Sequence, residues 1–260
     1  MDCLSNSFKF KELKCFLDEK VEQFNTIDFL AEDPLGIVHQ FSKKQDIEIM
    51  GLLMATIAWG NRKSIIASGK RLTEIFKNEP YEFVMMHTDE DFKDIHFVHR
   101  TFQTSDLQFF LGALKRVYEK SNSLEDSFSV NSEIPGVKGR IVNFRNSLLA
   151  FPHEKRTEKH LANPMKKSAA KRLNMFLRWM VRDDKKGVDF GIWENISPSD
   201  LYLPLDVHTS AVSRKLGLIN RKQDDWQALE ELMNNLKQFD PVDPCKYDFA
   251  LFGLGAIEQF

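Results

Sequence analysis

Two residues of this chain, Lys171 and Asp206, have side-chain types and local contexts that could act together in covalent chemistry. Lys171 follows Ser168-Ala-Ala and opens an amphipathic run, so we expect it in the first turn of a helix. Asp206 follows a proline-containing segment and precedes Val207, so we expect it at the start of another helix. A deprotonated amine can attack an electrophilic carbon, and a carboxylate beside that carbon can stabilise developing positive charge.

The residues around the pair affect how each side chain should behave, and each also has an ordinary structural interpretation. Lys166, Lys167 and Arg172 place positive charge near Lys171, which favours a neutral and therefore nucleophilic amine. Lys171 is otherwise one solvated lysine among several, and Lys167 is the alternative nucleophile. Asp206 is otherwise a helix N-cap, and one carboxylate can serve both as a cap and as a catalytic group.

The composition indicates a globular chain whose overall charge gives no general attraction to nucleic acid. Of 260 residues, 42% are hydrophobic, which is enough for one large domain or two helical lobes. Lys and Arg total 36 and Asp and Glu total 38, a net charge of -2, so contact with a polyanion requires a local basic patch. On charge alone, a neutral soluble enzyme that acts on small molecules is the simpler expectation.

Cysteine usage and the first residues indicate a protein of a reducing compartment. Cys3, Cys15 and Cys245 are scattered and odd in number, which argues against a disulfide framework and against thiolate metal sites. His96 and His99 lack an accompanying acidic pattern, so we expect no metal ion. The chain does not begin like a signal peptide, and no apolar run is long enough to cross a bilayer. We therefore expect a cytoplasmic protein with no membrane partner.

Apolar residues recur at helical spacing through most of the chain, and no alternating run is long enough for a convincing strand. Asp46 is expected to cap a helix that Gly60-Asn61 ends, and 188–205 to form an irregular insert after a turn at 183–187. The predicted fold class is all-α. The expected helices are 8–24, 47–59, 62–77, 105–119, 137–150, 168–182, 207–216, 223–238 and 244–254.

The segments around both candidate residues resemble the helix-hairpin-helix (HhH-GPD) DNA glycosylase superfamily, which includes endonuclease III and the 8-oxoguanine DNA glycosylases. In that superfamily a glycine-rich hairpin precedes a helix whose first turn carries the catalytic lysine, and Lys171-Arg-Leu-Asn-Met resembles that helix. The aspartate motif is matched by Leu205-Asp-Val-His-Thr-Ser-Ala-Val-Ser-Arg-Lys-Leu-Gly-Leu218. Residues 50–61 and 243–255 resemble its early buried helix and its terminal helix.

The resemblance covers most of residues 45–256, and it is closest to a bacterial family of unknown function, DUF2400. It extends to the archaeal 8-oxoguanine DNA glycosylases, in which the gap between lysine and aspartate is also long. Here the gap is 206 − 171 = 35 positions, about twice that of endonuclease III-like members, so the insert at 183–204 must loop out. The hairpin segment 163–170 has no glycine, and its phosphate contacts would come from Lys166, Lys167 and Ser168.

Several other residues are candidates for contact with a substrate. Trp59 and Asn61 end an apolar helix and are expected to be part core and part pocket rim, where an aromatic face could stack on a flipped base. Trp193, in the insert, is expected to be the best exposed aromatic, and His208 to lie beside the site. The basic run at 155–160 is either a solvated loop or a second phosphate contact, and the sequence leaves both open.

The resemblance implies a monomeric, all-α protein with a cleft between two lobes, at about 45–150 and about 151–256, the latter packed with the helix at 8–24. It implies excision of a damaged base, such as an oxidised purine, from duplex DNA, with Lys171 attacking C1′ and Asp206 activating it. Strand cleavage follows, and no metal or organic cofactor is implied. Two alternatives stay open: an inactive nucleic-acid-binding protein of the same fold, and a helical protein unrelated to nucleic acid.

Overall fold

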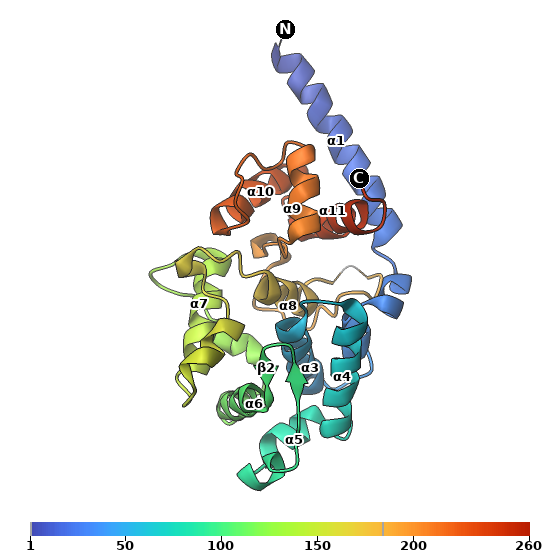
Figure 1. The fold of residues 1–260 in the computed structure, drawn as a ribbon. Coiled ribbons are helices and arrows are strands. Elements are labelled where there is room, and N and C mark those ends of the chain that lie inside the picture. Colours follow the sequence, from blue (N-terminus) through green and yellow to red (C-terminus); the bar gives the residue numbers. More distant parts are fainter. Residues whose placement is uncertain (1, 184) are drawn as a thin grey trace. The chain divides into compact units, whose positions relative to one another are not determined.

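The computed structural model describes residues 2–183 and 185–260, with side chains from Phe10 onward, and helices dominate it (Figure 1). Within this described part, the strands form one antiparallel pair, so the all-α prediction is confirmed. No helix there is both long and apolar enough to span a membrane. The α-helices are α1 (Asp2–Phe24), α2 (Leu35–Val38), α3 (Lys44–Ile57), α4 (Arg62–Ile75), α5 (Pro80–Met86), α6 (Thr104–Tyr118), α7 (Gly136–Leu149), α8 (Lys171–Val181), α9 (Val207–Lys215), α10 (Trp226–Phe239) and α11 (Tyr247–Ala256).

The strand pair joins β1 (Val98–His99) to β2 (Phe102–Gln103), with His99 opposite Phe102. Strands of two residues are too short to show an alternating pattern, which is why the sequence did not indicate them. Short 3-10 helices make up much of the remaining chain. They are η1 (Ile27–Glu32), η2 (Asp89–Phe92), η3 (Leu124–Phe128), η4 (Lys155–His160), η5 (Pro164–Lys166), η6 (Pro198–Asp200) and η7 (Pro244–Lys246).

The chain divides into two compact units. The first, which we call the split unit, combines the residues up to Phe29 with Lys167–Phe260. The second, the continuous unit, is Leu30–Lys166. The split unit contains both Lys171 and Asp206, so the geometry of that pair is a property of one unit.

Helix α3 forms the core of the continuous unit, because every residue from Asp46 to Ile57 is buried. Glu48 of α3 is fully buried, and it accepts hydrogen bonds from the Tyr118 hydroxyl (2.8 Å) and the Leu124 amide (3.1 Å), which compensate for the lost hydration. Asp46 lies inside the first turn of α3 rather than at its N-cap, so that expectation was wrong. Its carboxylate instead accepts a hydrogen bond from the Tyr81 amide at 2.7 Å.

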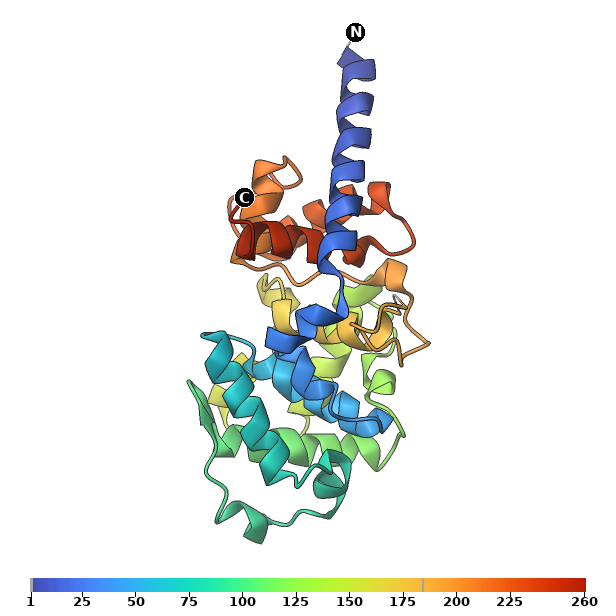
Figure 2. The same ribbon diagram turned by 90° about the vertical axis from the view of Figure 1, so that its right-hand side faces the viewer.

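In the split unit, α11 packs across the C-terminal part of α1, as Figures 1 and 2 show. The contact buries Leu17 and Val21 of α1. Gly253 makes the close approach possible, because a Cβ at that position would lie 2.2 Å from the Phe24 ring. The Tyr247 hydroxyl also donates to Asp18 at 2.9 Å, which joins two segments far apart in the sequence.

The segment between α8 and α9 has little regular structure, as expected, but it does not loop out. The Phe190 and Trp193 amides donate to the carbonyls of Trp179 and Met180, in the last turn of α8, at 2.8 and 3.0 Å. Its apolar side chains enter the core of the split unit, and they include Val188, Ile196, Leu201 and Leu203. The prediction of a protruding insert was therefore wrong, because burial of these side chains outweighs the lack of regular structure.

Candidate active site

Lys171 is the first residue of α8, so the helix begins three residues later than the sequence indicated. The preceding residue, Ala170, has a left-handed backbone (φ 48°), which turns the chain sharply into the helix. Since the Lys171 side chain is 39% exposed, its amine is open to a molecule arriving from solvent.

Asp206 is the N-cap of α9, as its sequence context predicted. One carboxylate oxygen, Oδ1, accepts a hydrogen bond from the Thr209 amide at 2.8 Å. The other, Oδ2, accepts one from the Lys171 amine at 3.2 Å. The cap therefore fixes the direction in which Asp206 presents its second oxygen, and the side chain is only 11% exposed.

The segment leading to Lys171 forms a tight hairpin although it contains no glycine. Lys167 (φ 67°) and Ala170 both take the left-handed conformation that glycine adopts most easily. The Lys167 carbonyl accepts a hydrogen bond from the Trp226 amide at 3.0 Å, and Ser168 pairs through its backbone with Asp225. The hairpin is thus held against the start of α10, with the Lys167 side chain exposed.

Asn174 fastens the same hairpin from the helix side. Its fully buried side chain donates to the Ala169 carbonyl at 2.9 Å. Asn174 lies one turn after Lys171 on α8, so this bond ties the loop before the lysine to the helix that carries it.

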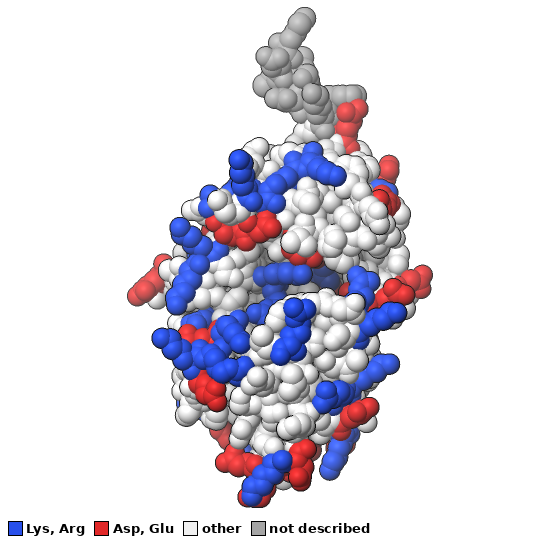
Figure 3. Space-filling model, in the orientation of Figure 1, with Lys and Arg blue, Asp and Glu red and all other residues white. Residues whose placement is uncertain are grey.

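The connection between α9 and α10 places acidic and basic side chains side by side (Figure 3). Arg221 donates to both oxygens of Asp225 at 2.7 and 2.6 Å, and this pairing lowers the pKa of the Asp225 carboxyl to about 2. Arg214 donates to Asp224 at 2.6 Å, which also accepts a bond from Ser210. Asp224 and Asp225 are therefore each paired with an arginine. These two carboxylates do not neutralise the positive charge of Lys167.

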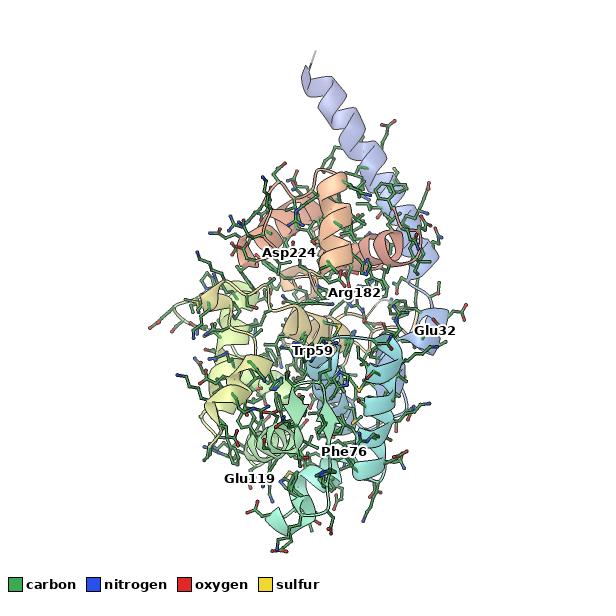
Figure 4. All side chains as sticks on the ribbon, viewed as in Figure 1. Glu32, Trp59, Phe76, Glu119, Arg182 and Asp224 are labelled. Atoms are coloured by element: carbon green, nitrogen blue, oxygen red, sulfur yellow. The ribbon has the colours of Figure 1, made fainter. Side chains whose placement is uncertain are left out.

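A buried cluster of ionised side chains connects α8 to neighbouring segments of the split unit. Arg178 of α8 and Arg182, which follows the end of α8 (Figure 4), both donate to Asp189 of the insert, at 3.3 and 3.0 Å. Arg182 also donates to Asp243 at 2.8 Å, and Arg178 donates to Asp248 of α11. The cluster joins α8, which begins with Lys171, to the insert and to α11.

Burial raises the pKa of the Asp248 carboxyl to about 6, because a charged carboxylate loses its hydration there. The Arg178 guanidinium opposes this effect, and the negative charge of Asp206 adds to it. Burial likewise raises the pKa of Asp243, against the pull of Arg182. The candidate pair therefore stands next to a site where an additional negative charge is costly.

Residues 33–257 match the family described as Protein of unknown function (DUF2400). The chain belongs to the DUF2400 family. It matches no curated protein and no solved structure at a significant level. The DUF2400 match includes the hairpin, Lys171 and Asp206, and α1 lies before it.

Two other predicted site residues of this DUF2400 chain lie in the split unit, and one of them was misjudged. His208 is exposed on the first turn of α9, with its ring edge-on to Phe252 at a centroid distance of 6.2 Å. Trp193 was expected to be exposed but is only 2% accessible, edge-on to Phe176 at 5.3 Å. A base has no access to Trp193, because this side chain is part of the core.

Trp59, Asn61 and Lys166 belong to the continuous unit. Trp59 follows α3 and is partly buried (Figure 4), and the Arg100 guanidinium lies 4.4 Å from its ring centroid. Asn61 is exposed and caps α4 by accepting the Ser64 amide at 3.3 Å. Lys166 is exposed at the end of η5.

The basic run at 155–160 is an ordered helix rather than a free loop. Arg156 donates to both oxygens of Asp106 at 3.0 Å, and the Thr157 hydroxyl donates to the same carboxylate at 2.7 Å. His160 is buried beside Asp106, so Lys155 and Lys159 carry the exposed charge of this run. Among the described residues, no group of three or more His, Cys, Asp or Glu side chains is placed to hold a metal ion.

The sequence did not indicate Asn174, Asp248 or Arg100 as members of a site. Asn174 could have been found, because a polar residue three positions after Lys171 shares its helix face. The partners of Asp248 and Arg100 lie 70 and 41 positions away (248 − 178 and 100 − 59), and no local pattern reports contacts over such distances.

Proposed function

We propose that this DUF2400 protein removes damaged bases from duplex DNA and then cleaves the strand, as a glycosylase and lyase of the helix-hairpin-helix type. The observation that carries the proposal is the 3.2 Å contact between the Lys171 amine and the Asp206 carboxylate. An accessible amine next to a shielded carboxylate of fixed orientation is the arrangement that this reaction needs.

In the proposed reaction, Asp206 moves a proton and stabilises charge, and Lys171 forms a bond to the sugar. Asp206 accepts a proton from the Lys171 amine, which then attacks C1′ of the sugar as the bond from C1′ to the base nitrogen breaks. The departing base leaves with that electron pair and takes up the proton held by Asp206, so Asp206 is a carboxylate again as positive charge develops on the sugar. The Asp206 carboxylate stabilises the positive charge that develops on the sugar in the transition state.

Strand cleavage follows from the covalent intermediate. Opening of the sugar ring gives a Schiff base between Lys171 and C1′, which acidifies the hydrogen on C2′. Loss of that proton expels the 3′ phosphate by β-elimination, and water then releases the lysine. An oxidised purine is the proposed lesion class, and the DNA-bound protein is proposed to be a monomer.

The hairpin geometry supports DNA as the partner. Left-handed residues at Lys167 and Ala170 give a loop of the tight kind that presents backbone amides to a phosphate, although glycine is absent. Exposed Lys167 adds a positive charge at the same place. The hairpin is also fastened to α8 and α10, so a phosphate bound there would locate the sugar relative to Lys171.

Borohydride trapping tests this proposal, because the reagent reduces a Schiff base to a stable protein–DNA adduct. The substrates are duplexes with one 8-oxoguanine or one abasic site, and an undamaged duplex is the blank. We expect an adduct with the wild-type protein, none with Lys171→Gln and at least ~100-fold less with Asp206→Asn. Lys215→Gln, which changes an exposed lysine at the end of α9, is the matched control and should trap normally.

The other outcomes contradict the proposal in distinguishable ways. Loss of the adduct in Lys167→Gln but not in Lys171→Gln would assign the chemistry to the hairpin lysine. Tight DNA binding with no adduct on any lesion would indicate an inactive binding protein of the same fold. Absence of any DNA binding would remove nucleic acid as the substrate.

A further inference from the structure

An exposed arginine in the continuous unit, Arg100, is held in a fixed position on an aromatic ring. Arg100 lies at the tip of the β1–β2 hairpin, and its guanidinium carbon is 4.4 Å from the centroid of the Trp59 ring. Among the described residues of its own unit, the Arg100 side chain makes no hydrogen bond and no ion pair. These residues therefore do not use the N–H donors of the guanidinium, which can bind a ligand.

The surroundings of Arg100 show that its position is specified by the fold. Its own backbone is left-handed (φ 56°), a strained conformation for a residue with a side chain. Gly60 lies directly against it, because a Cβ there would come within 2.5 Å of Arg100 Nη1. Gly60 also has a positive φ of 109°, so glycine meets both the steric and the backbone requirement at this position.

The hairpin that carries Arg100 is anchored to α4 and to Trp59 by its neighbour His99. The buried His99 ring is within hydrogen-bond distance of the Ser68 hydroxyl (2.8 Å) and of the Trp59 carbonyl (3.3 Å). These contacts fix the hairpin relative to the ring on which Arg100 lies. A side chain fixed before binding loses less conformational entropy when it takes up a ligand.

Other positive charges follow Gly60 in the sequence. Arg62 and Lys63 are exposed in the first turn of α4, which contains no acidic residue. Arg62 is paired with Glu32 at 4.0 Å, and the Glu32 side chain is 86% exposed, so water screens that interaction strongly. Figure 3 shows basic side chains exposed over this region of α4 and the hairpin.

We propose that Arg100, supported by Trp59, binds a phosphate group of the DNA backbone, with Arg62 and Lys63 adding charge beside it. A guanidinium presents paired donors that match two phosphate oxygens, and stacking on an indole leaves that edge free. The proposal rests on the proposed function for the identity of the polyanion. It assigns to the continuous unit a contact with DNA that involves neither Lys171 nor the hairpin at 167–170.

The salt dependence of binding to an undamaged duplex tests the assignment, since each phosphate contact releases counterions. We expect Arg100→Gln to weaken binding and to reduce the slope of log affinity against log salt by about 0.9. Arg100→Lys keeps the charge but not the planar fork, so it should keep the wild-type slope and bind several-fold more weakly. The measurement is fluorescence anisotropy of a labelled 20-base-pair duplex over a range of sodium chloride concentrations.

Arg116→Gln is the matched control, because Arg116 is also exposed and also lies over an aromatic ring, Phe151, at 5.9 Å. Its guanidinium already donates to the Ala150 carbonyl, so this variant should bind DNA with the wild-type slope. Equal slopes for Arg100→Gln and the wild type would overturn the proposal. An equal loss in Arg116→Gln would do the same, by showing that only overall charge matters.

The same titration separates the DNA backbone from a small phosphate as the ligand. Inorganic phosphate that replaces chloride at constant ionic strength should leave wild-type affinity for DNA unchanged. Displacement of the duplex by millimolar phosphate, abolished in Arg100→Gln, would overturn the assignment to DNA. The binding test uses an undamaged duplex and is therefore independent of the trapping test. If the wild type binds this duplex but gives no adduct on damaged DNA, only the glycosylase proposal is refuted. If it gives the adduct but Arg100→Gln keeps the wild-type slope, only the Arg100 proposal is refuted.

Discussion

The Asp248 carboxylate accepts a hydrogen bond from the Arg178 guanidinium at a position closed to solvent. The cluster around them holds Asp189, Asp243 and Asp248 against Arg178 and Arg182, so the acids outnumber the arginines. Burial raises the pKa of Asp248 to about 6, well above its ordinary value of 3.8. Between these two values the folded protein binds a proton that the unfolded chain does not.

The free energy of unfolding should therefore fall as pH rises from about 4 to above 6, by up to ~3 kcal/mol from this group. Urea unfolding of the wild type and of Asp248→Asn between pH 4.5 and 8 measures the effect. Since the asparagine does not titrate, the variant should gain stability relative to the wild type as pH rises. Parallel curves for the two proteins would show that Asp248 does not titrate in this range.

Substitutions of Asp206 should separate its capping role from its proposed chemical role. Asparagine retains a side-chain oxygen for the Thr209 amide, so Asp206→Asn should leave the free energy of unfolding nearly unchanged. Asp206→Ala removes the cap and should cost about 1 kcal/mol. Both variants should lose borohydride trapping. If Asp206→Asn traps like the wild type, the carboxylate is only a cap.

The left-handed backbone at Lys167 predicts an unusual response to substitution. Glycine suits a φ of 67°, so Lys167→Gly should be more stable than Lys167→Ala by about 1 kcal/mol. Lys167→Val should be the least stable of the three, because branching at Cβ disfavours this conformation. Thermal unfolding of the set checks the order. An equal stability for the glycine and alanine variants would contradict the hairpin geometry.

Trp193 should behave as a core residue and not as a ligand contact. Trp193→Ala removes a side chain packed on Phe176 and should cost about 3–5 kcal/mol of unfolding free energy. Trp193→Phe keeps most of the volume and should cost less while DNA affinity stays at the wild-type value. A Trp193→Phe protein that is fully stable but binds DNA more weakly would contradict this view.

Most helices could be predicted because their apolar spacing and caps are local properties. Asp206 illustrates this, since a carboxylate before Val207-His-Thr reads as a cap in the sequence and is one in the structure. Asp46 shows the limit, because an aspartate before an apolar helix also fits a cap, yet the Tyr81 amide, 35 positions away, takes its carboxylate. A local pattern shows which hydrogen-bond partners a capping side chain could have, but tertiary contacts determine which partner it binds.

The approach of Lys171 to Asp206 could be expected from the resemblance, but the path of the chain between them could not. Trp193 appeared exposed because a segment without periodicity usually lies at the surface. In the structure the Phe190 and Trp193 amides of this segment donate hydrogen bonds to the carbonyls of Trp179 and Met180, and Asp189 gives it two arginine partners. Such a segment is ordered by tertiary contacts, and the spacing of its apolar residues in the sequence does not predict them.

The division of the chain also determines when the candidate site can form during synthesis. Tyr247 reaches Asp18 across 229 positions, and a ribosome adding ~5–20 residues per second needs roughly 10–50 s to cover that distance. The continuous unit is fully translated well before then, whereas Leu17 and Val21 wait for the helix that covers them. A chain released before Asp206 is translated would carry an uncovered first helix and would lack the candidate pair, so such truncated products would be exposed to quality control.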